Sequence, residues 1–228
     1  MGFLIIGFIL LFILTSLPSL WTKHILKKHN QPHPDIPGTG LQFAEHLIHK
    51  LDLQGVRVEE TNHGDHYDPI EKVVRISSAY AHSNSLTAMT VVAHEMGHAL
   101  QDKQDYPELK QRTALIERSA IMQKFAGFAL LITPVLIPLT HSPLVGVITF
   151  TAGFIAMGVP FIIHLSTLPV EFDASFKRAL PLLEKGEYLN AQDQKTAKTI
   201  LFACAMTYVA VSLSSLFNLW KWVKALKR

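Results

Sequence analysis

Three long stretches of the chain are apolar and carry no charged residue. No Asp, Glu, Lys or Arg occurs at positions 1–22, 125–170 or 199–220. Because about 20 apolar residues in a helix cross the hydrocarbon core of a bilayer, each stretch can hold a membrane span. The middle stretch has a His-Ser-Pro turn signal between two apolar arms, which predicts a helical hairpin. The pattern therefore predicts an N-terminal anchor at 2–21, a transmembrane hairpin at 125–170 and a last span at 199–220, about four transmembrane helices in all.

Two polar segments, 22–124 and 171–198, separate these spans. In the first, the spacing of Phe43 and Leu47 after Thr39 predicts a short amphipathic helix with Thr39 as its cap. The alternating runs "VRVEE" and "KVVRIS" predict two strands of a small sheet, joined by a turn-rich loop. We therefore expect an α+β membrane protein that is mainly helical, with residues 1–228 forming one membrane-embedded domain.

The run "SNSLTAMTVVAHEMGHALQDKQ" predicts a serine-capped helix at about 85–103. On it, His94 and His98 lie one turn apart on the same face, so both imidazoles can bind one zinc ion. Glu95 is placed to reach a zinc-bound water but not to be a third ligand. Gly97 allows another element to approach at that turn. The alternative is a helix whose histidines bind no metal, but its apolar flanks would then bury His, Glu and His without partners, which is costly.

A zinc site on this helix requires a third protein ligand. The second polar segment follows directly on "LPV" and reads "EFDASFKRAL", in which Glu171 is the first charged residue after 46 uncharged ones. On a helix, Glu171, Ser175 and Arg178 share one face. We predict Glu171 as the ligand, with Asp173 as the alternative. Glu171 would also suit a solvated helix N-terminus, where acidic residues are favoured.

Four segments together, "DHYDP", "AHEMGHALQ", "LPVEFDAS" and "TYVA", resemble the YugP-type neutral zinc metallopeptidases of bacterial membranes. The resemblance follows the same order over nearly the whole chain. More distantly, HExxH with a downstream Glu is similar to the gluzincins, including HtpX and the CAAX prenyl proteases. Those relatives have Asp four residues after the Glu, where this chain has Ser175. Ser175 and Asp173 are the candidates to take over the role of that Asp, which is to orient a ligand histidine.

The resemblance implies a membrane-bound zinc metalloendopeptidase with one Zn²⁺ per chain. The two histidines and Glu171 would hold the zinc, and Glu95 would be the general base for a zinc-activated water. Tyr208 and Arg178 are the candidates for stabilising the oxyanion. The alternative function is a non-catalytic membrane scaffold or adaptor, in which zinc has four protein ligands. A structural site of that kind has no use for Glu95.

The loop "HGDHYDP" at 63–69 is the remaining polar cluster. Its Asp65 and His66 are candidates for contacting substrate or supporting the metal ligands, although Asp-Pro and His-Gly pairs are also common in turns. The strand "KVVRIS" that follows is a candidate for pairing with an extended substrate peptide.

The charge and the cysteine content limit which partners and which location in the cell we expect for this chain. The chain has 21 Lys and Arg against 18 Asp and Glu, and no basic stripe interleaved with aromatic residues, so we expect no nucleic-acid partner. The only cysteine excludes an intramolecular disulfide. The predicted spans indicate a multi-pass protein of the cell membrane. Basic residues beside these spans, such as Lys23 and Arg118, favour a cytoplasmic active site, whereas the basic tail at 221–228 favours the opposite orientation. The expected partners are the lipid bilayer and a protein or peptide substrate.

Overall fold

The computed structural model describes residues 2–225. Within its helices, side chains are described at Ile13 and from Ser16 to Ser214, apart from those of residues 123, 126, 127, 129, 130, 133, 134, 150, 153–158 and 161. The whole basic tail at 221–228, with Lys221, Lys224, Lys227 and Arg228, therefore lies outside the described side chains. The chain divides into two compact units, one of Met1–Leu109 and Leu168–Ala210, the other of Lys110–Thr167 and Val211–Arg228.

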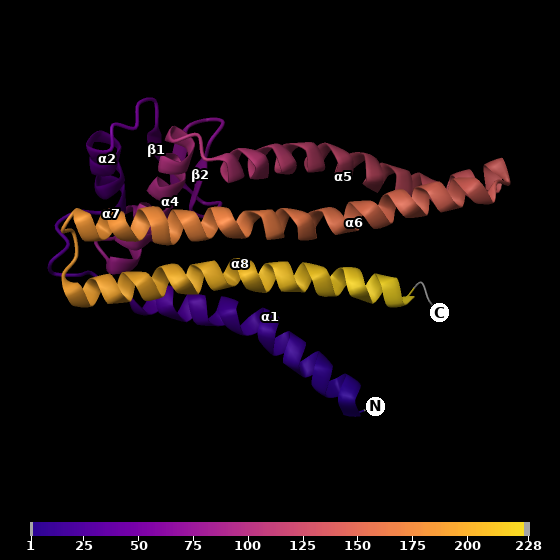
Figure 1. The fold of residues 1–228 in the computed structure, drawn as a ribbon, viewed down its shortest axis with the longest axis horizontal. Helices are drawn as coiled ribbons and strands as arrows, with labels where there is room; N and C mark the ends of the chain where they lie inside the picture. The colour runs from indigo at the N-terminus through magenta and orange to yellow at the C-terminus, as the bar shows by residue number, and fades with distance from the viewer. Residues whose placement is uncertain (1, 226–228) are drawn as a thin grey trace. The chain divides into compact units, whose positions relative to one another are not determined.

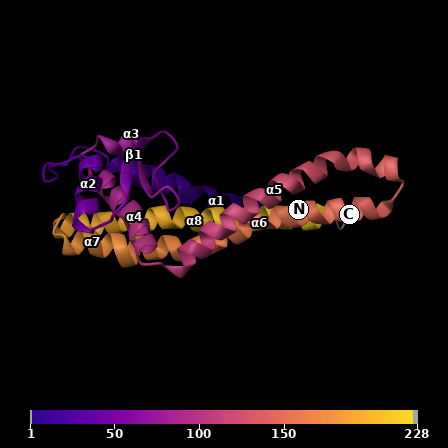
Figure 2. The ribbon, with the colours of Figure 1, turned by 90° about the horizontal axis from the view of Figure 1, so that it is seen from above.

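The first unit contains all three described strands and most of the short helices. Its helices are α1 (Gly2–Lys28), α2 (Gly40–Lys50), α3 (Ser78–Ala81), α4 (Leu86–Lys103), the π-helix η1 (Asp173–Ala179), α7 (Leu180–Lys185) and the first part of α8 (Ala191–Ala225). In Figures 1 and 2, α2, α4 and the strands gather around one another. The expectation of a mainly helical α+β protein is confirmed, since a small sheet accompanies these helices.

The sheet has three strands, β1 (Arg57–Thr61), β2 (His66–Asp68) and β3 (Val73–Ser77), in the order β1-β3-β2. The two predicted strands are confirmed as β1 and β3, which pair in parallel. The loop between them contains β2, which pairs antiparallel with β3 and which the turn-rich sequence concealed. Since β3 is paired on both sides, the expectation that "KVVRIS" pairs with a substrate peptide is wrong. The unpaired edge among the described strands that lies near α4 belongs to β2.

The helix predicted after Thr39 is confirmed as α2, and its cap has two reciprocal hydrogen bonds. Gln42 N–H donates to the Thr39 hydroxyl at 3.4 Å, and Thr39 N–H donates to Oε1 of Gln42 at 2.9 Å. The amphipathic face buries Phe43 and Leu47. These side chains join one core with β3, α4, α7 and α8, which includes Ile76, Val92, Met96, Leu183 and Ile200.

Helix α4 crosses this core and is buried nearly all round, as its apolar sequence predicted. Its N-cap is confirmed as Ser85, whose hydroxyl accepts a hydrogen bond from Ala88 N–H at 3.1 Å. The core on one side of α4 fixes the orientation of the polar side chains on the other. A buried helix is therefore the platform for the predicted metal ligands.

The second unit consists mainly of α5 (Pro107–Thr140) and α6 (Pro143–Phe172), which are joined at 141–142 (Figure 1). The predicted hairpin turn is therefore confirmed, although both helices extend beyond the apolar segment 125–170. Among the residues described with their side chains, one helical segment, Ala191–Ser214, is long and apolar enough to cross a membrane. The other predicted spans fall largely on stretches where the described side chains are interrupted, so four transmembrane helices remain a prediction.

Candidate metal centre

Two histidines on α4 form the centre of the site. The rings of His94 and His98 lie 4.8 Å apart between centroids, one turn apart on the same side of the helix. Both are largely enclosed, with side chains 11% and 7% exposed. The i, i+4 spacing in the sequence produces this pair because α4 is regular through the whole motif.

Glu171 is brought to both histidines from the last turn of α6. Its Oε2 lies 3.1 Å from Nε2 of His94 and 3.5 Å from Nε2 of His98. The interpretation of Glu171 as a solvated acid at a helix N-terminus is wrong, because the residue is 1% exposed. Burial opposes ionisation of this carboxyl, but the adjacent His98 and hydrogen bonds with both histidines outweigh burial and hold its pKa below the usual range.

A glycine and a π-helix allow the two elements to come this close. A Cβ atom on Gly97 would lie 2.6 Å from the carbonyl oxygen of Ala174, a distance that no side chain tolerates. Ala174 belongs to η1, so the segment after Glu171 is a π-helix and not the α-helix expected from the sequence. Glu171, in the last turn of α6, and Ser175, in η1, both contact His94 of α4.

The ring of His98 is oriented by Gln101, which is completely buried. Nδ1 of His98 lies 2.9 Å from Oε1 of Gln101. The Gln101 amide donates to the carbonyl of Val170 at 2.8 Å and to Oδ1 of Asp173 at 2.9 Å, which fixes its oxygen toward the histidine. An amide oxygen only accepts, so Nδ1 of His98 carries a proton, and Nε2, which faces Glu171, is the ring atom left for a metal.

The ring of His94 is oriented by Ser175, whose Oγ lies 3.1 Å from Nδ1. Ser175 is completely buried, and a hydroxyl can accept from the protonated Nδ1 as the carboxylate of the relatives would. Ser175 thus stands where that Asp was expected. Asp173 acts one step further out, because it contacts His98 only through Gln101.

Arg178 is linked to the site through Asp173. Its Nε donates to Oδ1 of Asp173 at 2.6 Å and its Nη1 donates to Oε1 of Gln104 at 2.6 Å. The guanidinium also lies over the ring of Tyr106, 5.4 Å from its centroid. These contacts use Asp173 and Arg178 in a chain of hydrogen bonds that ends at His98. The structure does not bring Asp173 into the group of metal ligands, which contains Glu171 instead.

Glu95 lies beside the three ligands and is 6% exposed. Burial raises the pKa of its carboxyl to about 7, with His94 opposing that shift and the charges of Glu171 and Asp65 adding to it. The backbone N–H of Tyr67, in β2, donates a hydrogen bond to this carboxyl. A buried carboxyl that changes protonation near neutral pH can both accept and return a proton.

The loop at 63–69 supports the site mainly through hydrogen bonds that fix the conformation of the loop itself. Oδ1 of Asp65 accepts hydrogen bonds from the backbone N–H and the hydroxyl of Ser77, at 2.7 and 2.9 Å. Nδ1 of His66 lies 2.9 Å from the carbonyl oxygen of Gly64. Asp65 therefore connects the segment before β2 to the end of β3. The charge of Asp65 also contributes to the raised pKa of Glu95. His66 completes a local turn.

Tyr208 lies half-buried on α8. Cys204, one turn earlier on the same helix, is close enough to Glu95 and Glu171 for their charges to act on its thiol. Residues four apart share a helix face. Tyr208 therefore shares a helix face with Cys204, and its role as oxyanion donor stays a prediction.

The donor set fits zinc. It contains two imidazole nitrogens and one carboxylate oxygen, all within 4.8 Å of one another. The separations of 3.1 and 3.5 Å from Glu171 to the two histidines are close to the edges of a tetrahedron with zinc bonds of about 2.0–2.2 Å. Both histidines have Nδ1 occupied and Nε2 directed to the shared carboxylate, which is the arrangement typical of zinc ligands.

Sequence reasoning missed Gln101 and the backbone of Tyr67. The signal for Gln101 was its position three residues after His98, on the same face of a helix that was already assigned. Tyr67 gave no comparable signal, because a backbone N–H has no sequence signature and β2 has only three residues.

Comparisons with known proteins point to a family whose description names zinc. A family model described as "Putative neutral zinc metallopeptidase" matches residues 4–227. The protein named "Putative membrane protease YugP" from Bacillus subtilis (strain 168) is 31% identical over 212 residues, which cover 90% of each chain. No solved structure matches the chain.

Proposed function

This chain belongs to the family of neutral zinc metallopeptidases, and we propose that it is a membrane-bound zinc endopeptidase that cleaves membrane or membrane-proximal proteins. One observation carries the proposal: the buried Glu95 carboxyl adjoins a group of three zinc-type ligands. Three protein ligands are typical of catalytic zinc, which keeps one position for water or substrate. A general base next to that position completes the requirement for peptide hydrolysis.

His94, His98 and Glu171 would hold the zinc ion. Zinc, when bound there, supplies a Lewis acid that lowers the pKa of a water and polarises the carbonyl of a peptide. Gln101 and Ser175 keep the two imidazoles in the protonation state that a metal requires. The two imidazole rings are therefore already oriented before the metal binds, so metal binding does not have to order them and costs less conformational entropy.

Glu95 would act as the general base and then as the general acid. Its carboxylate accepts a proton from the attacking water and passes it to the nitrogen of the departing amine, so the proton balance closes over one cycle. The hydrogen bond from Tyr67 N–H holds the carboxyl in place. Its pKa of about 7 in the metal-free protein supports a group that exchanges protons in both directions.

The oxyanion would be stabilised by the hydroxyl of Tyr208, on α8. Arg178 is a weaker candidate, because its guanidinium is already bonded to Asp173 and Gln104. For the substrate backbone we propose the unpaired edge of β2, whose Tyr67 N–H already contacts Glu95. An extended peptide added along that edge would pass its scissile bond beside the general base.

We propose a multi-pass protein with four transmembrane helices and a cytoplasmic active site. The printed name of the relative as a membrane protease and the span Ala191–Ser214 support a membrane location, and the positive-inside rule supports the side. A single cysteine tests it: Gln54→Cys, exposed before β1, in a Cys204→Ala background. A membrane-impermeant maleimide should label it in inverted vesicles and leave it unlabelled in intact cells. The reverse pattern would place the active site outside.

The scaffold alternative requires a closed site with four protein ligands. The candidates for the fourth ligand are Asp173 or a histidine of the loop at 63–66. Asp173 is bonded to Gln101 and Arg178, and His66 to Gly64. In the described part of the chain the ligand group at this site contains three residues, which supports catalysis over a closed structural site.

Substitution Glu95→Gln tests the proposal directly. The amide keeps the size of the side chain but cannot accept the proton, so we expect peptide cleavage to fall by about 10²–10⁴-fold. Zinc content, measured by mass spectrometry of the purified protein, should remain one ion per chain. Activity is followed with a fluorescent unfolded protein such as labelled casein, and Glu45→Gln, on the exposed side of α2, is the control. Wild-type cleavage by the Glu95→Gln protein would exclude the mechanism.

A further inference from the structure

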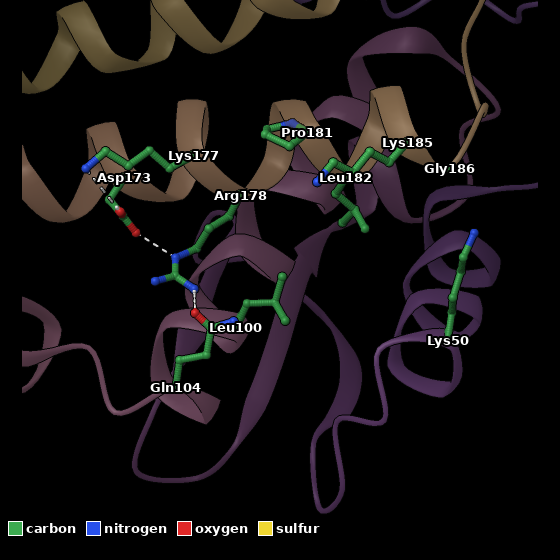
Figure 3. Close-up of a pocket in the computed structure, with 10 residues that line it drawn as sticks. All are labelled: Lys50, Leu100, Gln104, Asp173, Lys177, Arg178, Pro181, Leu182, Lys185 and Gly186. Atoms are coloured by element: carbon green, nitrogen blue, oxygen red, sulfur yellow. Dashed lines mark hydrogen bonds and ion pairs between the residues drawn. The ribbon is translucent and has the colours of Figure 1, made fainter.

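A pocket in the first unit is lined by Arg178 and Asp173, which also belong to the hydrogen-bond chain that ends at His98 (Figure 3). Its volume is about 350 Å³, which is in the range of small-ligand sites. The ends of α2 and α4 form its walls together with η1 and α7. Leu100, Pro181 and Leu182 line its apolar part. The pocket belongs entirely to the first unit.

The pocket is strongly cationic. Four basic side chains line it, Lys50, Lys177, Arg178 and Lys185, against the one carboxylate of Asp173. Oδ1 of Asp173 is already bonded to Arg178 and to Gln101, and its other oxygen is 3.9 Å from Lys177. Like charges that surround one cavity repel each other, and an anion in the cavity removes that repulsion.

Two of these lysines have no acidic partner. Within the described residues, neither Lys50 nor Lys185 forms an ion pair, and Lys50 instead has its ammonium 4.7 Å from the ring centroid of Tyr188. Their positions in the last turns of α2 and α7 suit the helix dipoles. That explanation does not extend to Arg178, which lies in η1 and directs its guanidinium into the same pocket (Figure 3).

Arg178 is held ready to bind an anion. Asp173 fixes its Nε, Gln104 fixes its Nη1, and Tyr106 supports the guanidinium plane. Among the described residues, its Nη2 has no hydrogen-bond partner. Proteins often bind phosphate with a guanidinium group that is fixed in one orientation and still has free N–H donors. Flexible lysine ammonium groups then add positive charge.

We propose that this pocket binds a phosphate-bearing anion, held by Arg178 and the ammonium groups of Lys50, Lys177 and Lys185. The ligand is either free phosphate or the phosphate of a lipid headgroup. The site is separate from the metal centre but joined to it, because Arg178 reaches His98 through Asp173 and Gln101. Phosphate binding does not depend on peptidase activity, so it can be measured on a catalytically silent protein.

Equilibrium dialysis with radiolabelled inorganic phosphate, at constant ionic strength, tests the site. The full-length Glu95→Gln protein in detergent should bind one phosphate per chain with saturation. Adding Lys50→Gln and Lys185→Gln should weaken binding by at least about tenfold. Adding Lys195→Gln and Lys198→Gln instead, which removes the same charge from an exposed part of α8, should leave binding unchanged. Absence of saturable binding, or equal loss in both variants, would overturn the proposal.

Reconstituted vesicles distinguish the two sources of phosphate. Phosphatidylglycerol in the vesicles should reduce the binding of labelled phosphate, relative to phosphatidylcholine alone, if a lipid headgroup is the ligand. Unchanged binding in both vesicles identifies free phosphate. Melting temperatures of all variants, measured in parallel, show whether a loss of binding comes from unfolding. A pocket variant that is folded and still binds phosphate at wild-type affinity excludes the site.

Discussion

Two groups of side chains in the first unit each bring three potential metal ligands within 4.8 Å of one another. One is the candidate metal centre. The other contains His33, Asp35 and Asp193, from the segment before α2 and the start of α8. The ligand atoms of the candidate metal centre are enclosed, whereas Asp35 is exposed and His33 is 26% exposed. Proximity of ligand atoms is common to both groups, so it does not distinguish a metal centre.

The contacts around the ligands do distinguish them. In the candidate metal centre, Nδ1 of each histidine is taken by Gln101 or Ser175, and Nε2 is left for a metal. In the other group, Nδ1 of His33 accepts a hydrogen bond from the backbone N–H of Asp35 at 3.3 Å. Nε2 then carries the proton and faces Asp193 at 3.5 Å. Imidazole and carboxylate groups therefore leave Nε2 atoms for a metal in the candidate metal centre, whereas in the other group the Nε2 atom of His33 is turned to Asp193.

Removing one histidine from each group is the strongest test of this comparison. We expect His98→Ala to weaken zinc binding by at least about 100-fold, because three ligands become two. His33→Ala should leave zinc content at one ion per chain and cleavage near the wild-type rate. Zinc is measured by mass spectrometry after dialysis against a weak chelator. A drop from two ions to one in the His33→Ala protein would make the second group a metal site and refute the comparison.

The role of the surrounding contacts is tested at Gln101. Gln101→Ala removes the acceptor for Nδ1 of His98 and leaves the ring free to rotate, so we expect zinc affinity to fall by about 10–100-fold. Gln104→Ala is the matched control, because it removes an exposed amide that contacts only Arg178 in this chain of bonds. Competition with a fluorescent zinc chelator measures both. Equal affinity in the two variants would show that ring orientation contributes nothing to metal binding.

The sequence predicted the parts of this molecule that depend on local spacing. The histidine pair follows from a helical period, and the caps Thr39 and Ser85 follow from side chains that reach backbone groups two or three residues away. The choice of Glu171 depended on its being the first charge after a long apolar segment. The signals for the histidine pair and the caps lie within a few residues of the features that they predict, whereas the signal for Glu171 is the whole uncharged segment 125–170.

The remaining features arise from contacts between distant segments. The π-helical turn at η1 lies where this segment approaches α4 closely. The distance between two such distant segments cannot be read from the sequence. The third strand was hidden because His66–Asp68 is short and polar enough to pass for a turn. The link between Gln101 and Asp173 joins residues 72 positions apart, which no periodicity can reveal.

The close approach of η1 to α4 is tested by Gly97→Ala. Its Cβ would lie 2.6 Å from the backbone oxygen of Ala174, which cannot move independently, so we expect a loss of about 1–3 kcal/mol in stability and a measurable loss of zinc affinity. Gly38→Ala is the control, because its Cβ would meet only the flexible Gln42 side chain, at 3.2 Å. Thermal unfolding in detergent gives both values. Wild-type stability in Gly97→Ala would mean that the two helices do not require this contact.

The smallest expected effect is a pH dependence that burial confers on Glu95. Because the pKa of Glu95 is raised from 4.5 to about 7 in the folded, metal-free protein, the folded state binds a proton that the unfolded chain has released between those values. Stability therefore falls as pH rises through that window. Glu95→Gln removes the penalty, so it should stabilise the zinc-free protein by about 1–3 kcal/mol at pH 8.5 and much less at pH 5. Exposed Glu45→Gln should show no such change between the two pH values. A gain for Glu95→Gln that is equal at both pH values would mean that Glu95 is not held in a desolvated position.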